Sequence, residues 1–378
     1  MSRPTPSAAV RLLRTHFGPL PDRRKRSRTL HPLLSLIFLA LAGTLTGARG
    51  WDELADFADE RKDWLAALID LPKGPPSADT IRRAFEAMRP RAFADAFAAW
   101  AEALAGALRG QVVAADGKAV RGAVEHAGAN NPLHLLHVWA TDQRLLLGQR
   151  ATNGAPGEAA ALVELLAVLE LKGATVTTDA GNCTRAVAHA VREAGADYLL
   201  CLRGNRRALH DRVRALFEGP GKPPPTTSYV ACSRGHGRHE RRRVLALGLE
   251  GTPAADARWA GLRTAVRVER TRTLGGRTST EVRYYITSLP ADARALATKI
   301  RAHGSVENQL HWSLDVGLAE DACPIRKGHG AENLAAVRRM ALTLLQRDTS
   351  HQGGLVRKQK RAALSPTYLL HLLSLGTP

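Results

Sequence analysis

Three acidic residues in this chain stand where a divalent-metal site could form. Asp116 follows directly on the apolar run VVAA, Asp179 ends the predicted strand ATVTTD, and Glu307 lies within the segment SVENQLHWSLDV. Two aspartates brought together at one edge of a sheet repel each other unless a cation lies between them. Carboxylate oxygens with water suit Mg²⁺ or Mn²⁺. A third carboxylate lets such a site hold two ions about 3.5–4 Å apart for phosphoryl transfer.

Several residues are candidates for the third carboxylate. Glu307 is favoured because it shares a predicted helix face with His311, four residues later, and with Asp315, eight residues later. Asp315, Glu320 and Asp321 stay open as alternatives. Asp116, Asp179 and Glu307 also have plain structural interpretations, as part of a hairpin turn, as a helix cap and as a complement to a helix dipole.

The elements expected between residues 111 and 203 bring the two aspartates together. The patterns predict strands at 111–115, 133–142, 144–152, 174–179 and 197–203, with helices at 157–171 and 182–195. Three successive strands indicate an antiparallel meander, and the strand–helix–strand connections indicate parallel pairing. This is the order of the ribonuclease H-like fold, with the first and fourth strands adjacent. Asp116 is then expected to end its strand at the carboxyl edge of the sheet, where sites in α/β proteins gather.

The rest of the chain indicates an α/β protein with added segments. In the helix at 182–195, Asn182 is the expected N-cap and Gly195 the expected stop. We expect an N-terminal helical domain at 1–105, a catalytic core in two parts at 106–215 and 291–348, a β-rich insertion at 216–290 with basic loops at 234–243, and a basic C-terminal tail at 349–378.

The charge of the chain favours a polyanionic partner. The sequence has 54 Lys and Arg against 35 Asp and Glu, a formal net charge of +19. Nucleic acid is the first expectation and an anionic membrane surface the second. The residues expected to contact DNA are Lys118, Arg121, Asn308, His311, Arg326, Lys327, Arg82 and Arg83. Solvated surface charge is the alternative for the basic residues near the acidic ones.

Two interpretations are open for each of the other candidate site residues. The helix that carries Arg82 and Arg83 fits either the front of a helix-turn-helix or a capped helix in a bundle, with its start near Ser77. His311 and Asn308 are candidates to orient Glu307, although a satisfied helix histidine is favoured for His311. For Trp312, a buried aromatic is favoured over base stacking.

Cysteines and apolar runs exclude further classes of protein. The four cysteines are widely spaced, without a Cys-x-x-Cys motif, so neither a zinc site nor a disulfide framework is expected, and a reducing cytoplasm associated with the nucleoid is the expected location. The uncharged run at 33–48 is shorter than the roughly 20 residues of a membrane span. A buried helix is therefore favoured there, and no membrane association is expected.

Several blocks of the sequence resemble one known family. They are HPLLSLIFLALAGTLTGARGWDELADFA, PPSADTIRRAF, DGKAVRG, VTTDA, DYLLCLRGN, HGRHERRRV, EVRYYITSLP, SVENQLHWSLDV, EDACPIRKG and ENLAAVRRMALTLL. In this order they resemble the H-repeat-associated transposases, which are DDE insertion-sequence transposases. The resemblance implies a ribonuclease H-like core, two Mg²⁺ or Mn²⁺ ions held by Asp116, Asp179 and Glu307, and cleavage of element ends followed by strand transfer. The partner is double-stranded DNA, and bringing two ends together suggests a homodimer.

The chain departs from the family pattern at positions near the acidic residues. Gly304 stands where a tryptophan is usual, and Thr184 stands where glutamine is usual. Ile300 and His303 replace the tyrosine and arginine of the wider insertion-sequence group. These changes leave the metal ligands intact but affect residues that position DNA. A catalytically inactive DNA-binding protein is therefore the alternative, and a metal-dependent nuclease without end specificity is a third hypothesis.

Overall fold

A nine-stranded mixed sheet forms the centre of the molecule. The computed structural model describes residues 6–25, 27, 29–124, 132–152, 154–235, 237–323, 325 and 328–375. The strands are β1 (Val112–Val124), β2 (Pro132–Ala140), β3 (Leu145–Thr152), β4 (Thr175–Thr178), β5 (Asp197–Leu202), β6 (Thr227–Gly235), β7 (Arg238–Gly248), β8 (Thr264–Leu274) and β9 (Arg277–Thr287). Their order across the sheet is β3-β2-β1-β4-β5-β9-β8-β7-β6.

β1 is longer than the sequence predicts. β1 is parallel to β4 from Val112 to Ala115, and Ala115 pairs with Thr178. The prediction that β1 ends at Asp116 is wrong, because the strand continues to Val124 against antiparallel β2. Only the pairing with β4 stops at Asp116. The predicted adjacency of the first and fourth strands is confirmed, and β4 is also parallel to β5.

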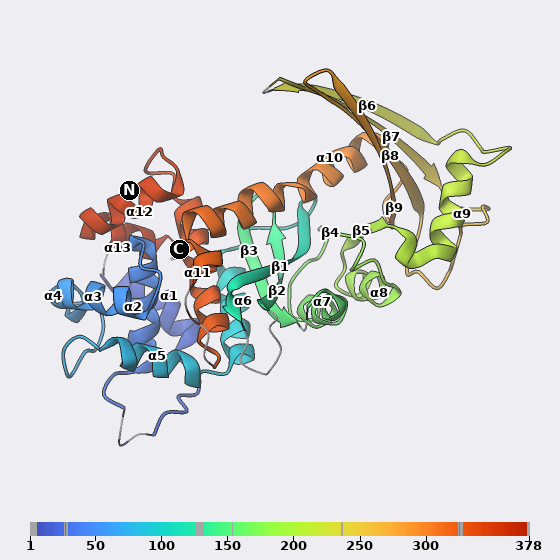
Figure 1. Cartoon of the computed structure of the whole chain (residues 1–378). Coiled ribbons are helices and arrows are strands. Elements are labelled where there is room, and N and C mark those ends of the chain that lie inside the picture. Colours follow the sequence, from blue (N-terminus) through green and yellow to red (C-terminus); the bar gives the residue numbers. More distant parts are fainter. Residues whose placement is uncertain are drawn as a thin grey trace.

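Helices cover both faces of the first five strands (Figure 1). α7 (Glu158–Leu166) and α8 (Arg185–Glu193) pack together on one face. On the other face lie α10 (Ala293–His303), two wide π-helical segments at Glu307–His311 and Ser313–Gly317, and α11 (Gly330–Arg347). α10 contacts β1 and β4 directly, so it leads the chain across the sheet to Glu307.

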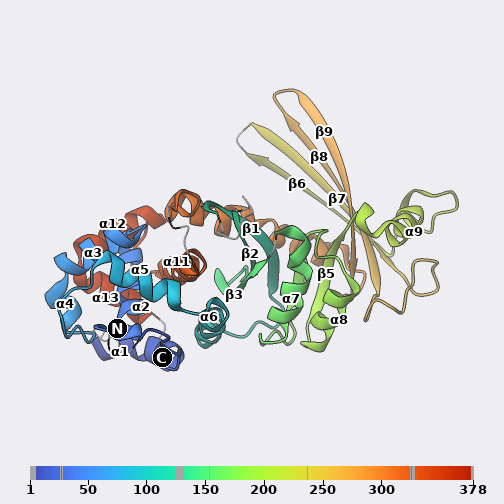
Figure 2. The ribbon, with the colours of Figure 1, turned by 60° about the horizontal axis from the view of Figure 1, so that its bottom comes forward.

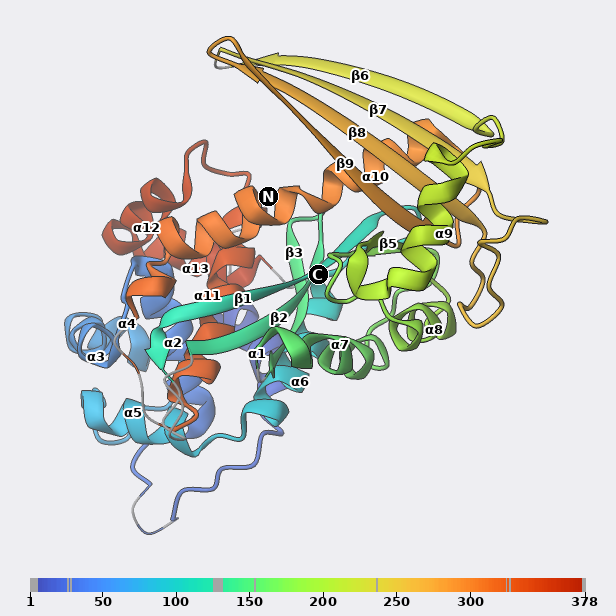
Figure 3. The same cartoon turned by 45° about the vertical axis from the view of Figure 1, so that its right-hand side comes forward.

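Strands β6–β9 extend the sheet away from the body (Figure 2). β9 pairs antiparallel with β5, so the residues expected as a β-rich insertion continue the same sheet. Residues 234–243, expected as basic loops, lie mainly in the β6–β7 hairpin, where Arg234 pairs with His239. α9 (Arg207–Glu218) packs on β9, and α10 packs on β6 and β7. The extension arches over α10 and the central strands (Figure 3).

The helical part combines both ends of the chain. Its helices are α1 (Pro6–Phe17), α2 (Leu33–Thr46), α3 (Trp51–Glu60), α4 (Lys62–Ala66), α5 (Ala78–Ala87), α6 (Pro90–Leu104), α12 (Leu355–Leu364) and α13 (Pro366–Ser374). α2 contacts α11, α12 and α13. Residues 349–375 are therefore part of a helical bundle, which differs from the expected basic tail. Lys358 of the basic RKQKR segment is buried and donates to the carbonyl of Leu345 at 2.8 Å.

The apolar helix near the N-terminus is buried in this bundle, as expected. Its residues Leu36–Ala42 are almost fully enclosed. Within the described residues, no single helix has the length and apolar character to cross a membrane. α2 and α3 together meet the length and composition criteria, but they are bent by 94° relative to each other.

Candidate metal centre and DNA interface

The sheet register brings the two predicted aspartates to one edge. Ala115 and Thr178 form the last β1–β4 pair, and Asp116 and Asp179 are the next residues of their chains. Past this point no strand lies beside β1 on the β4 side among the residues that the structure describes. The carboxylates therefore reach an open edge while their backbones are held by the core of the sheet.

Glu307 reaches the same edge of the sheet from the face that α10 and the π-helical segments cover, opposite α7 and α8. One oxygen of Asp116, one oxygen of Glu307 and a ring nitrogen of His311 all lie within 4.8 Å of one another. Glu307 is mostly exposed, and its Oε2 lies 3.5 Å from Nδ1 of His311. Both residues belong to a π-helical turn, a wide helix form found often at functional sites. Asp179 stands outside this group, although its charge acts on Asp116.

The acidic surroundings change the protonation of Asp116. Burial, together with the nearby charges of Asp179 and Glu307, raises the pKa of its carboxyl to about 7. A carboxylate in this position is costly unless a cation compensates its charge. The carboxylate oxygens of this group fit Mg²⁺ or Mn²⁺. The site can therefore hold a divalent ion at Asp116, Glu307 and His311, with Asp179 beside them.

His311 is not the satisfied helix histidine that was favoured from the sequence. It is buried, and its Nε2 has no hydrogen-bond partner among the described residues. Its ring stands 6.0 Å from the ring of His137, whose Nε2 accepts from Nε of buried Arg339 at 2.9 Å. The ring nitrogen that faces Glu307 is Nδ1, and its position beside the two carboxylates makes His311 a candidate metal ligand.

The other candidates for the third carboxylate form ion pairs with basic residues. Lys118 Nζ lies 2.7 Å from Asp315 Oδ1 and 3.1 Å from Asp321 Oδ1. Glu320 forms a fully buried ion pair with both terminal nitrogens of Arg339. These contacts support Glu307 over Asp315, Glu320 and Asp321. Lys118, which is predicted to contact DNA, has a side chain that is only 7% exposed and pairs with two of these carboxylates.

Comparison with known families decides what kind of chain this is. Residues 108–344 match the family described as Transposase DDE domain, and residues 14–101 match the DDE_Tnp_1-associated family. The chain belongs to the DDE transposase family. It is 31% identical to "H repeat-associated putative transposase YhhI" of Escherichia coli (strain K12), over 97% of this chain and 98% of that protein.

Two further relatives support the same family. "Putative transposase YncI" of Escherichia coli O157:H7 is 31% identical over 97% of this chain and 95% of its own length. The "Uncharacterized protein in dhlA 3'region" of Xanthobacter autotrophicus is 39% identical over 73% of this chain and 94% of its own length. The predicted resemblance to the H-repeat-associated DDE transposases is therefore confirmed.

The other predicted DNA contacts of this DDE transposase fall into different settings. The Arg121 side chain is 82% exposed, with its Nε 3.8 Å from Asp321 Oδ2, and Asn308 is exposed beside Glu307. Trp312 is 58% exposed, so the favoured interpretation of a buried aromatic is wrong. Arg326 and Lys327 lie outside the described residues.

The helix that carries Arg82 and Arg83 is a capped helix packed in the bundle. Ser77 caps α5, and its Oγ accepts from the backbone of Thr80 at 3.3 Å. α5 packs against α3 and α11. Arg82 pairs with Glu86 at 2.9 Å, and Arg83 pairs with Asp79 at 2.7 Å. Both arginines remain at least partly exposed at the front of the helix, so a DNA contact from them stays a prediction.

The departures from the family pattern have local structural roles in this DDE transposase. Thr184, and not Asn182 as expected, caps α8, because its Oγ1 accepts from the backbone of Val187 at 3.1 Å. Gly195 ends the helix with a positive φ of 69°, as expected. His303 Nδ1 lies 3.0 Å from Oγ1 of Thr177 on β4, so it ties α10 to the sheet next to Asp179.

One acidic residue of the site was missed from the sequence. Glu158, the first residue of α7, is buried, and its charge raises the pKa of Asp116. The strand directions indicate its position: β3 runs in the same direction as β1, because each is antiparallel to β2. The helix after β3 therefore begins at the edge where Asp116 lies. Glu158 could therefore be recognised as a site residue only after the edge that carries Asp116 was known.

Proposed function

We propose that this chain is an active transposase that cleaves the ends of a mobile element and transfers the 3′-hydroxyl into target DNA. Asp116, Asp179 and Glu307 would hold Mg²⁺ or Mn²⁺, and bound ions of this kind activate the attacking oxygen and stabilise the leaving oxygen. The observation that carries the proposal is the convergence of an Asp116 oxygen with Glu307 and His311 within 4.8 Å, beside Asp179. The order β3-β2-β1-β4-β5 supports a ribonuclease H-like core.

The protein residues have separate tasks in this proposal. Asp116 is held by its pairing with His137 on β2, Asp179 follows directly on β4, and both would offer carboxylate oxygens to the metal ions at the scissile phosphate. Glu307 enters on a π-helical turn and is exposed, so it is accessible from the DNA side. Buried Arg339 is hydrogen-bonded to His137 and Glu320, and the His137 ring in turn packs against the ring of His311. The Arg121 guanidinium stands at the exposed rim, where it can meet a backbone phosphate.

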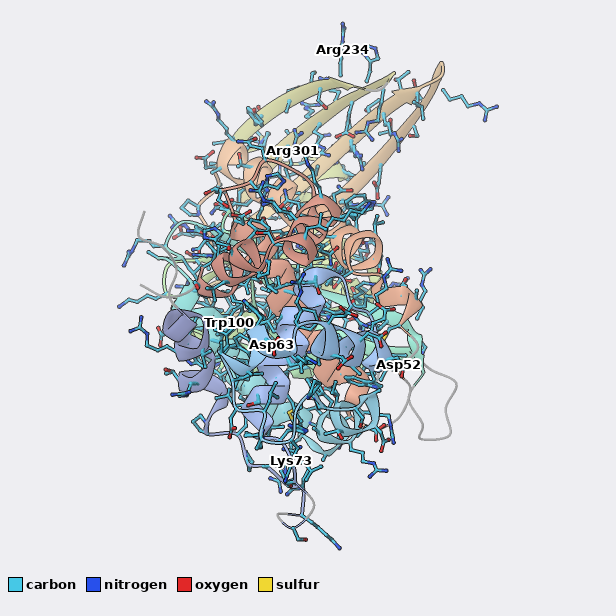
Figure 4. The ribbon with its side chains drawn as sticks, turned by 90° about the vertical axis from the view of Figure 1, so that its left-hand side faces the viewer. Asp52, Asp63, Lys73, Trp100, Arg234 and Arg301 are labelled. Carbon is cyan, nitrogen blue, oxygen red and sulfur yellow. The ribbon has the colours of Figure 1, made fainter. Side chains whose placement is uncertain are left out.

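A run of arginines on the extension supports the approach of DNA to this edge. Arg242 of β7 pairs in register with Arg270 of β8, and Arg283 of β9 lies on the same face two positions along. The charge of Arg301 on α10 acts on Arg242, and the charge of Arg283 acts on His303 beside the carboxylates. Arg234 lies at the outer tip of the extension and Arg301 nearer the body (Figure 4). Arginine suits phosphate contacts of this kind.

A cleavage assay tests the proposed activity. The substrate is a duplex that carries the inverted repeats flanking the source locus, incubated with the full chain and Mg²⁺ or Mn²⁺. We expect nicking at the repeat ends that is lost on chelation and lost in Asp116→Asn and Glu307→Gln. The matched control is Asp142→Asn, an exposed aspartate at the opposite end of the sheet, which should cleave like the natural protein.

The second candidate is an inactive DNA-binding member of the family. The sequence departures at Gly304 and Thr184 favour it. Under this alternative the protein binds the repeats as tightly as an active enzyme but does not nick them with either metal ion. Thr184 weakens this alternative, because its role as the α8 cap accounts for its presence. Equal cleavage of unrelated duplexes would instead identify a nuclease without end specificity.

A further inference from the structure

A buried glutamate lies directly against the backbone that carries Asp116. The Glu158 side chain is 8% exposed. A Cβ atom at Gly117 would lie 1.9 Å from Glu158 Oε1 and 2.7 Å from Cε1 of His134. A side chain at position 117 would displace the Glu158 carboxylate, so the absence of one is what lets this carboxylate approach the strand one residue after Asp116.

An amide connects this glutamate to the second aspartate. Asn182 is fully buried, and its Nδ2 donates to Glu158 Oε2 at 2.8 Å and to Asp179 Oδ1 at 3.1 Å. The Asn182 backbone N–H also donates to Asp179 Oδ1 at 3.3 Å. Asn182 Oδ1 has no partner within the described residues. The amide thus turns its donor toward two carboxylates, the orientation that allows hydrogen bonds to both, while its own oxygen stays unsatisfied.

The remaining oxygen of Glu158 is held from the strand side. Glu158 Oε1 lies 3.4 Å from Nε2 of His134, whose Nδ1 lies 2.9 Å from Oγ1 of Thr152. The carboxylate also stands at the first residue of a nine-residue helix, where the backbone dipole favours negative charge. Burial raises the pKa of Glu158, and the charge of Asp179 acts in the same direction. An acid kept buried among other acids is costly, and such arrangements gather at functional sites.

We infer that Glu158 is a positioning residue for the metal centre, which fixes the second aspartate through Asn182. The inference rests on the proposed function. Glu158 fixes the Asn182 amide, and Asn182 fixes Oδ1 of Asp179 with two hydrogen bonds. Asp179 follows a strand of only four residues and pairs with no strand among the described residues, so this support replaces the backbone pairing that holds Asp116 on β1.

Direct measurement of Mn²⁺ binding tests this inference without relying on turnover. The dissociation constant of Mn²⁺ is measured by electron paramagnetic resonance of the free ion for the full chain and its variants. We expect Asn182→Ala and Glu158→Ala each to weaken binding about ten- to hundredfold, the usual effect of losing a residue that supports a metal ligand. Glu158→Gln keeps an oxygen that can accept from Asn182, so it should retain most of the affinity.

The double variant separates support through Asn182 from direct ligation. If Glu158 acts through Asn182, Glu158→Ala combined with Asn182→Ala should be no weaker than Asn182→Ala alone, because the two losses are not additive. Multiplied losses would overturn the inference and make Glu158 an independent ligand. Unchanged Mn²⁺ affinity in both single variants would also overturn it. Circular dichroism melts establish that each variant is folded.

A further variant separates this inference from the proposed function. Asp116→Asn should lose Mn²⁺ binding if the metal centre exists. Mn²⁺ binding that depends on Asp116 but not on Glu158 or Asn182 would overturn the positioning role alone. A natural protein that does not bind Mn²⁺ at this edge would overturn the proposed function itself, and the positioning role with it.

Discussion

Ala115 of β1 and Thr178 of β4 form the last parallel pair between these strands, and an aspartate follows each of them. This register explains why two acids that are 63 residues apart in the sequence meet at one edge. It also explains why they affect each other: the charge of Asp179 helps to raise the pKa of Asp116. The predictions below test the consequences of this arrangement and of the contacts around it.

The stability of the metal-free protein should depend on the ionisation of Asp116. Its folded-state pKa of about 7 lies above the ordinary value of 3.8, chiefly because of burial. Ionisation is then disfavoured in the folded state, so stability should fall as the pH rises from about 4 to about 7 and stay low above that. The shift corresponds to about 4 kcal/mol at most. Asp116→Asn should remove this loss, so in urea melts it should be more stable than the natural protein at pH 8.

Magnesium provides the control for that prediction. Added Mg²⁺ should raise the melting temperature of the natural protein at pH 8 and leave Asp116→Asn unchanged, because the ion stabilises the folded state only where it binds. If the stability of the natural protein had the same pH dependence as that of Asp116→Asn, the pKa of the Asp116 carboxyl would not be raised as described.

Lys118 should contribute to stability and not to DNA binding. Its ammonium is buried among Asp315 and Asp321, so Lys118→Met removes the cation of Asp315 and leaves Asp321 with the Arg121 guanidinium at 3.8 Å. We expect a loss of about 2–3 kcal/mol in the free energy of unfolding, below the 3–5 of a fully enclosed pair because the carboxylates are about one third exposed. Urea denaturation measures this loss. A stable variant with weakened DNA binding would restore the phosphate contact predicted from the sequence.

Arg121 should behave in the opposite way. Its side chain is exposed, so Arg121→Ala should leave the free energy of unfolding within about 0.5 kcal/mol of the natural value. If its guanidinium meets a phosphate, the slope of log affinity against log salt concentration should decrease by about 1. Fluorescence anisotropy with a labelled repeat duplex at several salt concentrations gives this slope. An unchanged slope would make Arg121 a solvated surface charge.

The C-terminal helices should make the bundle sensitive to acid. Burial alone would raise the pKa of Asp348, but hydrogen bonds from Ser350 and Tyr368 and the charge of Lys358 lower it to about 2. Because this value lies below the ordinary 3.8, the stabilisation is present above pH 4 and is lost as the pH falls from about 4 to about 2. Asp348→Asn should be less stable than the natural protein at pH 6, with a smaller further loss on acidification. Identical acid profiles in thermal melts would contradict this.

The sequence predicted those parts of the fold that local periodicity determines. The strands at β2 to β5 and the helices around α7 and α8 were found because apolar residues repeat with the strand or helix period. The order of these elements then placed Asp116 beside Asp179. The length of β1 was underestimated, because Asp116, Gly117 and Lys118 break the apolar run while pairing with β2 holds the strand extended.

The parts that the sequence did not predict depend on tertiary contacts. Asn182 and Thr184 are both good helix caps, and only the position of Glu158 explains why Thr184 takes the cap and Asn182 turns inward. Lys118 follows an acid and looks like a phosphate contact until Asp315 and Asp321 arrive from a segment about 200 residues later. Trp312 lies between the two π-helical segments, where the wider turns change the face that a residue presents, so regular helical periodicity does not reveal its exposure.

The central claim is that Asp116, Asp179 and Glu307 hold divalent ions at one edge of the sheet. Anomalous diffraction from crystals of the full chain soaked in Mn²⁺ tests it most directly. The account predicts anomalous density bonded to oxygens of all three carboxylates and absent in Asp116→Asn crystals. Density that is missing from this edge, or that is bound elsewhere while Glu307 stays in solvent, would contradict it.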